Sequence, residues 1–363
     1  MNQKQLLEVI KATKHEILDL LINQNIVDDE VAQQTLNTIN EMFSRLNLEI
    51  DDVIPKETLA AYFGGVDEAT KLLKDAGVQP VNGVVSSITS NGIVNAAFKK
   101  RVHLEAIAEI TDNTILDLKA AIRTARINAV GSIERALADV KKELQGGVIH
   151  GRTREVVTQR VAESFAKEGM TSFVTVDGKK LPLDFYSETV TRTQMKQAHT
   201  KGAAERYREN GMDLFIVTGN TPTCHQCAPL RGVVFTLNPN RTDYTYLDPK
   251  DVIRHPNCQC SMSVWVESYK AAKEIERAQR KSLAFDPSKD TRSKAQKGAY
   301  EKQQALHRRS NAEKKQFMEW NATLGAENYK TLGAFRRAKR SNSVRFQELQ
   351  SEFRSRRLVK LKE

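Results

Sequence analysis

Apolar residues in the first half of the chain recur at the three- and four-residue spacing of an amphipathic helix. The pattern is clearest in two stretches, whose apolar positions are Leu6, Ile10, Leu18 and Leu21 in one and Leu104, Ile107, Leu118 and Ile122 in the other. The stretch Leu104–Gln145 predicts one long rod, bent near Gly131, and Arg154–Lys167 predicts a further helix. We therefore expect residues 1–168 to form a mostly helical arm or bundle.

After Gly169 the apolar spacing changes from the helical period to alternation. Residues 172–176 predict a strand, and Asp177-Gly178 predicts the tight turn of a hairpin, because this pair tolerates positive φ angles. A helix is expected from Phe185 to Asn210. Short apolar runs then predict strands at Leu214–Val217, Val233–Leu237 and Ser261–Val266. Residues 169–266 are thus expected to form a small α+β module with an antiparallel sheet.

Residues 267–363 return to charged helical sequence, and helices are expected near 267–282, 289–318 and 328–359. This tail has few aliphatic residues, so alone it is expected to bury little and to pack on a partner or stay mobile. The predicted fold class is α+β: a long helical N-terminal region, a central module with a Cys/His cluster, and a basic helical tail.

The positive charge of the chain is concentrated in this tail. The whole chain carries a formal charge of +11, and Val266–Glu363 holds 25 Lys and Arg against 12 Asp and Glu. Clustered cations attract phosphate without any sequence motif. Candidate DNA-binding residues are Arg336, Arg337, Lys339, Arg340, Arg354, Arg356 and Arg357. Docking to an acidic protein surface and a merely solvated helix face are the alternatives.

The four cysteines gather in one short region as Cys224-His-Gln-Cys227 and His255-Pro-Asn-Cys258-Gln-Cys260. A C-x-x-C turn directs two sulfurs at one centre, and the side chains of an extended C-x-C leave the same face of the strand. Two such elements predict a structural zinc site with Cys224 and Cys227 and with further ligands among Cys258, Cys260 and His255. His225 is a sixth candidate. Disulfides and buried reduced thiols remain alternatives.

Signals for an enzyme or a membrane protein are missing from the sequence. There is no phosphate-binding loop, no dinucleotide fingerprint, no nucleophile elbow and no H-E-x-x-H zinc motif. Glu188 and Arg192 are expected to form an ordinary i,i+4 helix salt bridge. No apolar run approaches the length of a membrane span, and no signal peptide is recognised. We expect a non-enzymatic protein without catalytic residues. Alternatives are a zinc-dependent nuclease and a zinc-stabilised DNA-binding protein.

Three sequence blocks between Gly169 and Cys260 resemble a known family. They are the run from Gly169 to Thr193, the segment Met212–Val217, and the paired Thr223–Gly232 and His255–Cys260 motifs. In order and spacing they resemble the phage minor capsid protein 2 family, part of the wider Mu F-like head-morphogenesis group of tailed bacteriophages.

The resemblance implies a low-copy protein of the phage head near the portal vertex, which assists capsid assembly and genome packaging or delivery. Its implied partners are the portal protein, the major capsid protein and packaged double-stranded DNA. Its implied location is the virion, after assembly in the reducing host cytoplasm.

Overall fold

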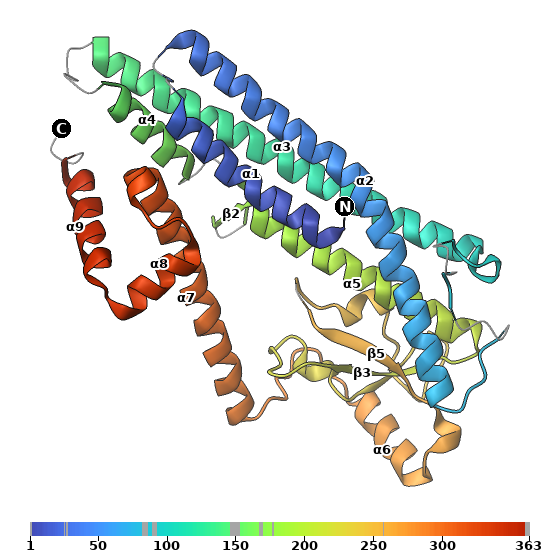
Figure 1. Ribbon diagram of the computed structural model, residues 1–363. Helices are drawn as coiled ribbons and strands as arrows, with labels where there is room; N and C mark the ends of the chain where they lie inside the picture. Colours follow the sequence, from blue (N-terminus) through green and yellow to red (C-terminus); the bar gives the residue numbers. More distant parts are fainter. Residues whose placement is uncertain are drawn as a thin grey trace. The chain divides into compact units, whose positions relative to one another are not determined.

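The computed structural model describes residues 2–24, 26, 28–81, 86–88, 93–145, 153–166, 170–175, 178–256 and 258–359 (Figure 1). The chain divides into two compact units, each assembled from separated segments. The unit that contains the cysteines, here the cysteine unit, comprises Met1–Gln3, Ile50–Leu118 and Glu188–Gln303. The other, here the tail unit, comprises Lys4–Glu49, Lys119–Ser187 and Gln304–Glu363. The division in chain order at residues 168 and 266 stays a prediction.

The helical prediction for the N-terminal region is confirmed. Its helices are α1 (Gln3–Asn23), α2 (Asp29–Asp75), α3 (Arg101–Gln145) and α4 (Thr153–Ser164). The predicted rod is present as α3, which continues through Gly131 as one helix. After α4, Phe165 and Ala166 form a π turn, and Lys167, where the prediction ended, lies outside the described residues.

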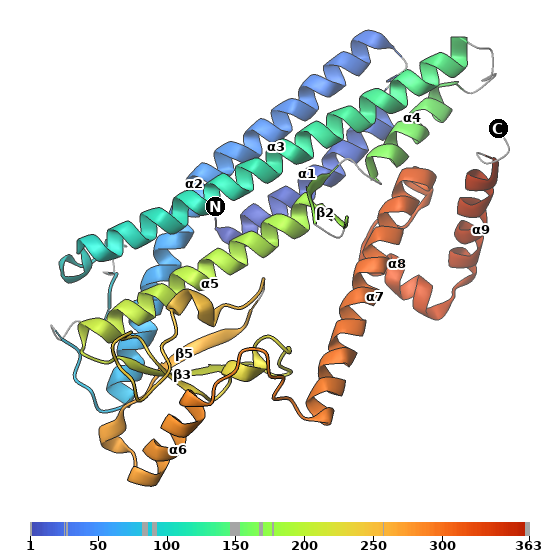
Figure 2. The same ribbon diagram turned by 180° about the vertical axis from the view of Figure 1, so that it is seen from behind.

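The cysteine unit holds a three-stranded antiparallel sheet in the order β4-β3-β5. Its strands, all three predicted, are β3 (Leu214–Gly219), β4 (Val234–Thr236) and β5 (Cys260–Val264). The predicted long helix is present as α5 (Leu183–Glu209), and α6 (Ala272–Leu283) contacts β4, beside the sheet in both views (Figures 1 and 2). Short 3-10 helices cover Ala96–Phe98, Ala228–Leu230, Pro249–Val252 and Glu267–Tyr269.

Two glycines allow α2 and α5 to cross in backbone contact inside the cysteine unit. A Cβ atom placed on Gly65 would lie 1.9 Å from the carbonyl oxygen of His199, and one on Gly202 would lie 2.1 Å from that of Tyr62. Real side chains never approach so closely. The crossing therefore depends on glycine at both positions, one in each helix.

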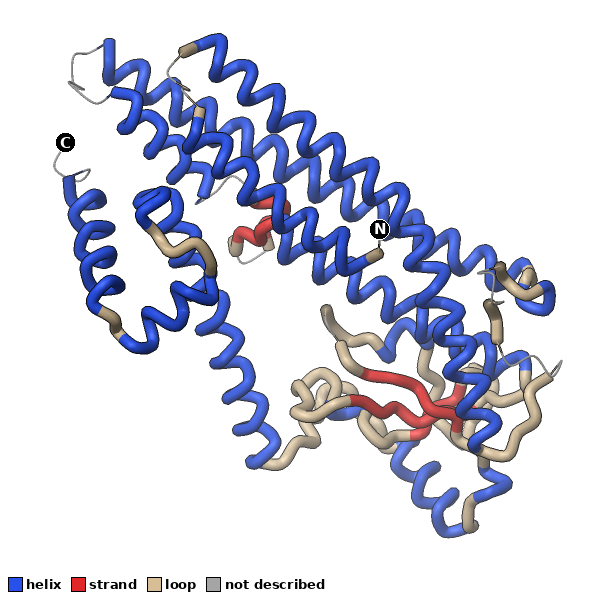
Figure 3. The backbone as a smooth tube through the Cα atoms, viewed as in Figure 1, coloured by secondary structure: helices blue, strands red, loops and turns tan. Residues whose placement is uncertain are grey.

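The tail unit contains the predicted hairpin, formed by β1 (Thr171–Val174) and β2 (Lys180–Pro182), which pair antiparallel. It appears as the smaller patch of strand in Figure 3. Its turn includes Gly178, whose φ of 80° is the positive value expected of the Asp-Gly pair. Asp177 itself lies outside the described residues. The tail unit thus has a second, smaller sheet of its own.

The end of the chain forms α7 (Lys294–Leu324), α8 (Leu332–Ser341) and α9 (Val344–Val359). The prediction of one helix over 328–359 is wrong, because the chain turns at Asn342, which has a left-handed φ of 46°. Asparagine tolerates this conformation better than most residues, so it can end a helix without glycine. A short 3-10 helix, Gly325–Glu327, follows α7.

These last helices bury more apolar side chains than their composition predicted. Six buried side chains form an aromatic core: Phe317, Trp320, Leu324, Phe335, Phe346 and Leu349. Trp320 stacks on Phe346 with ring centroids 5.1 Å apart and meets Phe335 edge to face at 5.2 Å. Each buried aromatic side chain removes about 150 to 250 Å² of surface from water, so a few rings are enough to form a small core. The tail therefore has a core without many leucines.

Among all the described helices, none is both long and apolar enough to cross a membrane.

Candidate metal centre

The first two cysteines are presented by a tight turn that follows β3. The backbone N–H of Cys227 donates to the Sγ atom of Cys224 at 3.4 Å, and the N–H of Ala228 donates to the carbonyl oxygen of Cys224 at 3.1 Å. The 3-10 helix Ala228–Leu230 begins directly after this turn. Both thiols are buried and face the same interior. The turn therefore presents two sulfurs together, as the C-x-x-C spacing predicted.

The second pair comes from the segment that enters β5. Cys258 lies just before the strand and Cys260 is its first residue, and both are buried. The Sγ atoms of Cys227 and Cys258 are 3.4 Å apart, well beyond a disulfide bond, and all four cysteines are free thiols in the structure. Because β5 pairs with β3, the sheet brings two segments more than thirty residues apart to one point.

His255 completes the cluster from the same second segment. Its Nε2 atom lies 3.0 Å from the Sγ of Cys224 and 3.2 Å from the Sγ of Cys227. Its Nδ1 atom lies 2.7 Å from the carbonyl oxygen of Pro256, so Nδ1–H donates there and leaves the Nε2 lone pair free. Metal-binding histidines are commonly held in this way, by a hydrogen bond from the second nitrogen to a backbone carbonyl.

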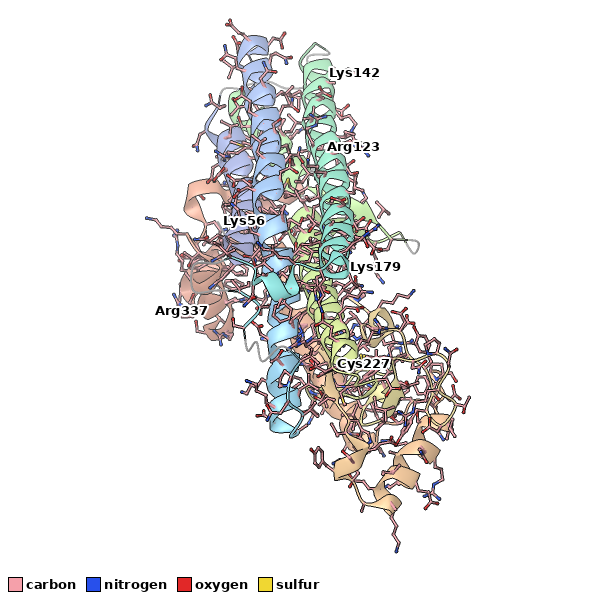
Figure 4. All side chains as sticks on the ribbon, turned by 90° about the vertical axis from the view of Figure 1, so that its right-hand side faces the viewer. Lys56, Arg123, Lys142, Lys179, Cys227 and Arg337 are labelled. Carbon is pink, nitrogen blue, oxygen red and sulfur yellow. The ribbon has the colours of Figure 1, made fainter. Side chains whose placement is uncertain are left out.

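The structure brings together all five predicted ligands. Their ligand atoms form two groups with separations within 4.8 Å, Cys224, Cys227 and His255 in one and Cys227, Cys258 and Cys260 in the other. Cys227 belongs to both groups and is the centre of the cluster; Figure 4 labels it among the side chains of the cysteine unit. His225, the sixth candidate, is exposed and belongs to neither group.

The crowding of sulfurs changes the acidity of the thiols. The hydrogen bond with Cys258 raises the pKa of Cys227 far above its ordinary value, while the same bond lowers the pKa of the Cys258 thiol. Buried thiolates at this separation repel one another, so one carries the negative charge while its neighbours keep their protons. A divalent cation at the centre would remove this conflict, because it lets several thiols ionise together.

The observed separations are close to those of a zinc site. Zn–S bonds of about 2.3 Å in a tetrahedron place sulfurs about 3.8 Å apart. The S···S separation of 3.4 Å between Cys227 and Cys258 is about 0.4 Å shorter than this value. The N···S separations of 3.0 and 3.2 Å from His255 are shorter than the roughly 3.6 Å expected for one Zn–N and one Zn–S bond, so outward shifts of about half an ångström would admit an ion. The two groups contain only Cys and His, the donor set of structural zinc sites.

Sequence reasoning missed the residues that surround the cluster. Arg292 donates from Nη1 to the carbonyl oxygen of Thr223 at 3.1 Å and lies over the ring of Tyr300 at 5.3 Å. Its pKa is raised, first by hydrogen bonding to Asp290 and also by the charge of Cys224. Arg292 thus places a cation against an anionic cluster. It is 68 residues from Cys224, and no local pattern connects the two.

The seven predicted DNA-binding residues lie on α8 and α9 of the tail unit and are not equivalent. Arg336 and Arg356 form ion pairs with carboxylates, whereas Arg337, Arg340 and Arg354 are exposed. Figure 4 labels Arg337 at the edge of the tail helices. The Lys339 Nζ donates to the amide oxygen of Gln316 at 2.6 Å. The side chain of Arg357 lies outside the described part of the chain.

Fold and site together define a mostly helical α+β protein in which four buried cysteines and one partly buried histidine form a cluster. The chain belongs to the phage minor capsid protein 2 family, whose model matches residues 3–354, nearly its whole length. It is accordingly a structural component of the phage head and is located in the virion. No curated protein and no solved structure matches the chain.

Proposed function

We propose that this minor capsid protein acts inside the phage head, where it associates with the portal and major capsid proteins and assists head assembly and DNA packaging or delivery. The family match over residues 3–354 carries the proposal. Long helices suit contact along a partner, and the basic tail suits an interior filled with DNA. Assembly would take place in the host cytoplasm.

The proposal is tested by quantitative mass spectrometry of purified, nuclease-treated particles and of empty precursor heads, combined with chemical cross-linking. A few to a few tens of copies per particle, with cross-links to the portal, are expected. Absence of the protein from both mature particles and precursors would overturn the proposal. Cross-links confined to the major capsid protein would remove the portal assignment.

The Cys/His cluster is proposed to hold one structural zinc ion that fixes the loop after β3 to β5. The convergence of five donors and the Nδ1 hydrogen bond of His255 support this assignment. Such an ion would stabilise the cysteine unit by adding a second connection, beside the pairing of β3 with β5, between the turn after β3 and the segment that enters β5. The donors are only Cys and His, the set typical of structural zinc sites, so we assign the ion a role in folding.

Substitutions within the cluster identify the ligand set. Cys227 belongs to both groups, so Cys227→Ser is expected to abolish zinc binding, whichever residue is the fourth ligand. His255→Ala and Cys260→Ala distinguish a site of three cysteines and one histidine from a site of four cysteines, because only the true ligand is needed for tight binding. His225→Ala, which alters an exposed histidine in the same turn, is the matched control and should retain zinc.

The measurement is zinc content by mass spectrometry on protein purified without chelator, together with the absorption of the cobalt-substituted protein, which reports the number of sulfur ligands. About one zinc per chain is expected for the unaltered protein. Less than about 0.2 equivalents in a fully folded protein would exclude the metal and favour buried thiols.

A further inference from the structure

Five of the seven predicted DNA-binding residues on α8 and α9 fall into two sets with different surroundings. In the first set, Arg336 donates to Glu313 at 3.1 Å and to the hydroxyl oxygen of Ser310 at 2.6 Å. Arg356 donates to Glu352 at 2.7 Å and to Glu327 at 2.8 Å. These two arginines, here the paired arginines, connect α8 and α9 to α7 and to the turn that follows it.

The second set, here the outer arginines, comprises Arg337, Arg340 and Arg354. All three are exposed, and among the described residues none has a carboxylate within salt-bridge distance. Arg337 and Arg340 are three residues apart on α8, so they are neighbours on one helix face, about 5–6 Å apart at Cβ. Carboxylates of the same chain thus accompany the paired arginines, whereas among the described residues the outer arginines have no such counter-charge.

The surplus of positive charge in this part of the chain is large. Residues 304–363 contain 15 Lys and Arg and 6 Asp and Glu. Of these acids, Glu313, Glu327 and Glu352 form the ion pairs with the paired arginines. Half of the acids therefore pair with arginines within the tail, and residues 304–363 keep a formal surplus of nine positive charges.

We propose that the outer arginines bind the phosphate backbone of double-stranded DNA, and that the paired arginines are structural residues which hold the tail helices together. This inference rests on the proposed function in the DNA-filled head and assigns that contact to three of the seven predicted cations. The binding is independent of base sequence, because guanidinium groups on an exposed helix surface need only phosphate oxygens to pair with.

The surroundings of the outer arginines favour DNA over an acidic protein. A protein interface needs an apolar centre from which water is excluded, and the aromatic residues of the tail are turned inward into their own core. The large apolar side chains that α7, α8 and α9 expose are limited, among the described residues, to Leu306 and Val344. Charge without an apolar centre is typical of a surface that binds polyanions.

The experiment measures binding of the full-length protein to a mixed-sequence DNA duplex by fluorescence anisotropy between about 50 and 200 mM salt. The test variant carries Arg337→Ala, Arg340→Ala and Arg354→Ala. The logarithmic salt slope is expected to fall by about 2 to 3, close to one for each lost phosphate contact, and affinity at low salt should fall at least about tenfold. The corresponding triple Arg→Lys variant should retain most of the slope.

A matched control removes the same charge elsewhere, by Lys273→Ala, Arg277→Ala and Arg280→Ala on α6, where these residues are also exposed. This variant should bind DNA almost as well as the unaltered protein. Arg336→Ala should lower the melting temperature but leave the salt slope nearly unchanged. The salt slope and the melting temperature together distinguish a residue that contacts phosphate from one that stabilises the fold.

Equal loss of affinity in the outer and α6 variants would overturn the assignment and leave only net charge as the cause. Absence of binding by the unaltered protein at about 50 mM salt would also overturn it, as would stronger binding to poly-glutamate than to DNA. None of these results affects the presence of the protein in the particle, which the mass-spectrometric inventory measures separately.

Discussion

At the scale of single residues, Glu209 shows how a partly buried charge is kept ionised. Its carboxylate accepts hydrogen bonds from Lys100 at 2.6 Å and Arg206 at 3.2 Å, and lies 3.3 Å from Nε2 of His103. Burial alone would raise its pKa, but the hydrogen bonds from His103, Lys100 and Arg206 outweigh burial and lower the pKa to about 2. His103 is in turn fixed by the hydroxyl of Tyr62, 2.9 Å from Nδ1.

The depressed pKa of Glu209 predicts a defined pH dependence of stability. The carboxylate is more acidic in the folded than in the unfolded chain, so its contribution is present above an ordinary pKa of 4.5 and is lost as the pH falls toward 2. Glu209→Gln should cost about 2 kcal/mol at pH 7 and weaken the pH dependence of stability between about 5 and 2. Urea unfolding at several pH values measures this.

The control is Glu105→Gln, which removes an exposed i,i+4 partner of Arg101. Such a pair contributes well under about 1 kcal/mol, so stability should hardly change. If the two substitutions had the same effect at every pH, the network around Glu209 would contribute no more than a surface ion pair.

At the scale of elements, the contact of α2 with α5 is set by glycine and not by large apolar side chains. Gly65 and Gly202 each face a backbone carbonyl of the opposite helix, so there is no flexible side chain that can move aside. Glycine within a helix usually lowers helix stability by about 1 kcal/mol relative to alanine. Here the close approach of the two helices more than offsets that cost.

Gly202→Ala is therefore expected to destabilise the protein by about 3 kcal/mol, because the new methyl group would force two backbones apart. Gly64→Ala is the matched control: it lies next to Gly65 on the exposed face of α2, and its nearest neighbour would be 3.9 Å away. That change should be neutral or slightly stabilising. Thermal unfolding measures the stability of both variants. Equal melting temperatures would argue against a tight crossing of α2 and α5.

The break between α8 and α9 shows where local sequence reasoning failed at this scale. The run 328–359 has no proline, and Gly333 lies near its start, so periodicity alone predicted one helix. The turn is made by Asn342 in a left-handed conformation, flanked by two serines. Packing of Phe335 and Phe346 into one core favours the reversal over a straight rod. The sequence Ser341-Asn342-Ser343 is compatible with a turn, but whether the chain turns there depends on tertiary contacts.

At the scale of the whole molecule, the two units are each built from three separated segments. Helices α2, α3, α5 and α7 contribute residues to both units, so neither corresponds to one continuous stretch of sequence. The proposed metal lies wholly within the cysteine unit. Its removal should therefore affect that unit first.

Chelation with EDTA is expected to lower the melting temperature by several degrees while most of the far-UV helical signal is retained, because most helical residues lie outside the metal-bearing loops. Re-addition of zinc should restore the original transition, whereas magnesium, which binds thiolates poorly, should not. A melting temperature unchanged by chelator in zinc-loaded protein would show that the ion adds nothing to stability.

The sequence by itself determined the elements and the chemistry. Periodicity located the long helices and the strands, the Asp-Gly pair located the hairpin, and the spacing of Cys and His named five residues that the fold brings together. These features are local, because helical and strand periods and turn preferences extend over only a few residues. The three sequence blocks also identified the family.

Only the tertiary structure decided which distant residues meet. Pairing of β3 with β5 joins the two cysteine segments, and folding of the chain after α6 brings Arg292 against Cys224. Ion pairing on α7, α8 and α9 separates the paired arginines from the outer ones, although all belong to the same basic run of sequence. Such contacts depend on the packing of the complete chain, so a local pattern of polar and apolar residues does not predict them.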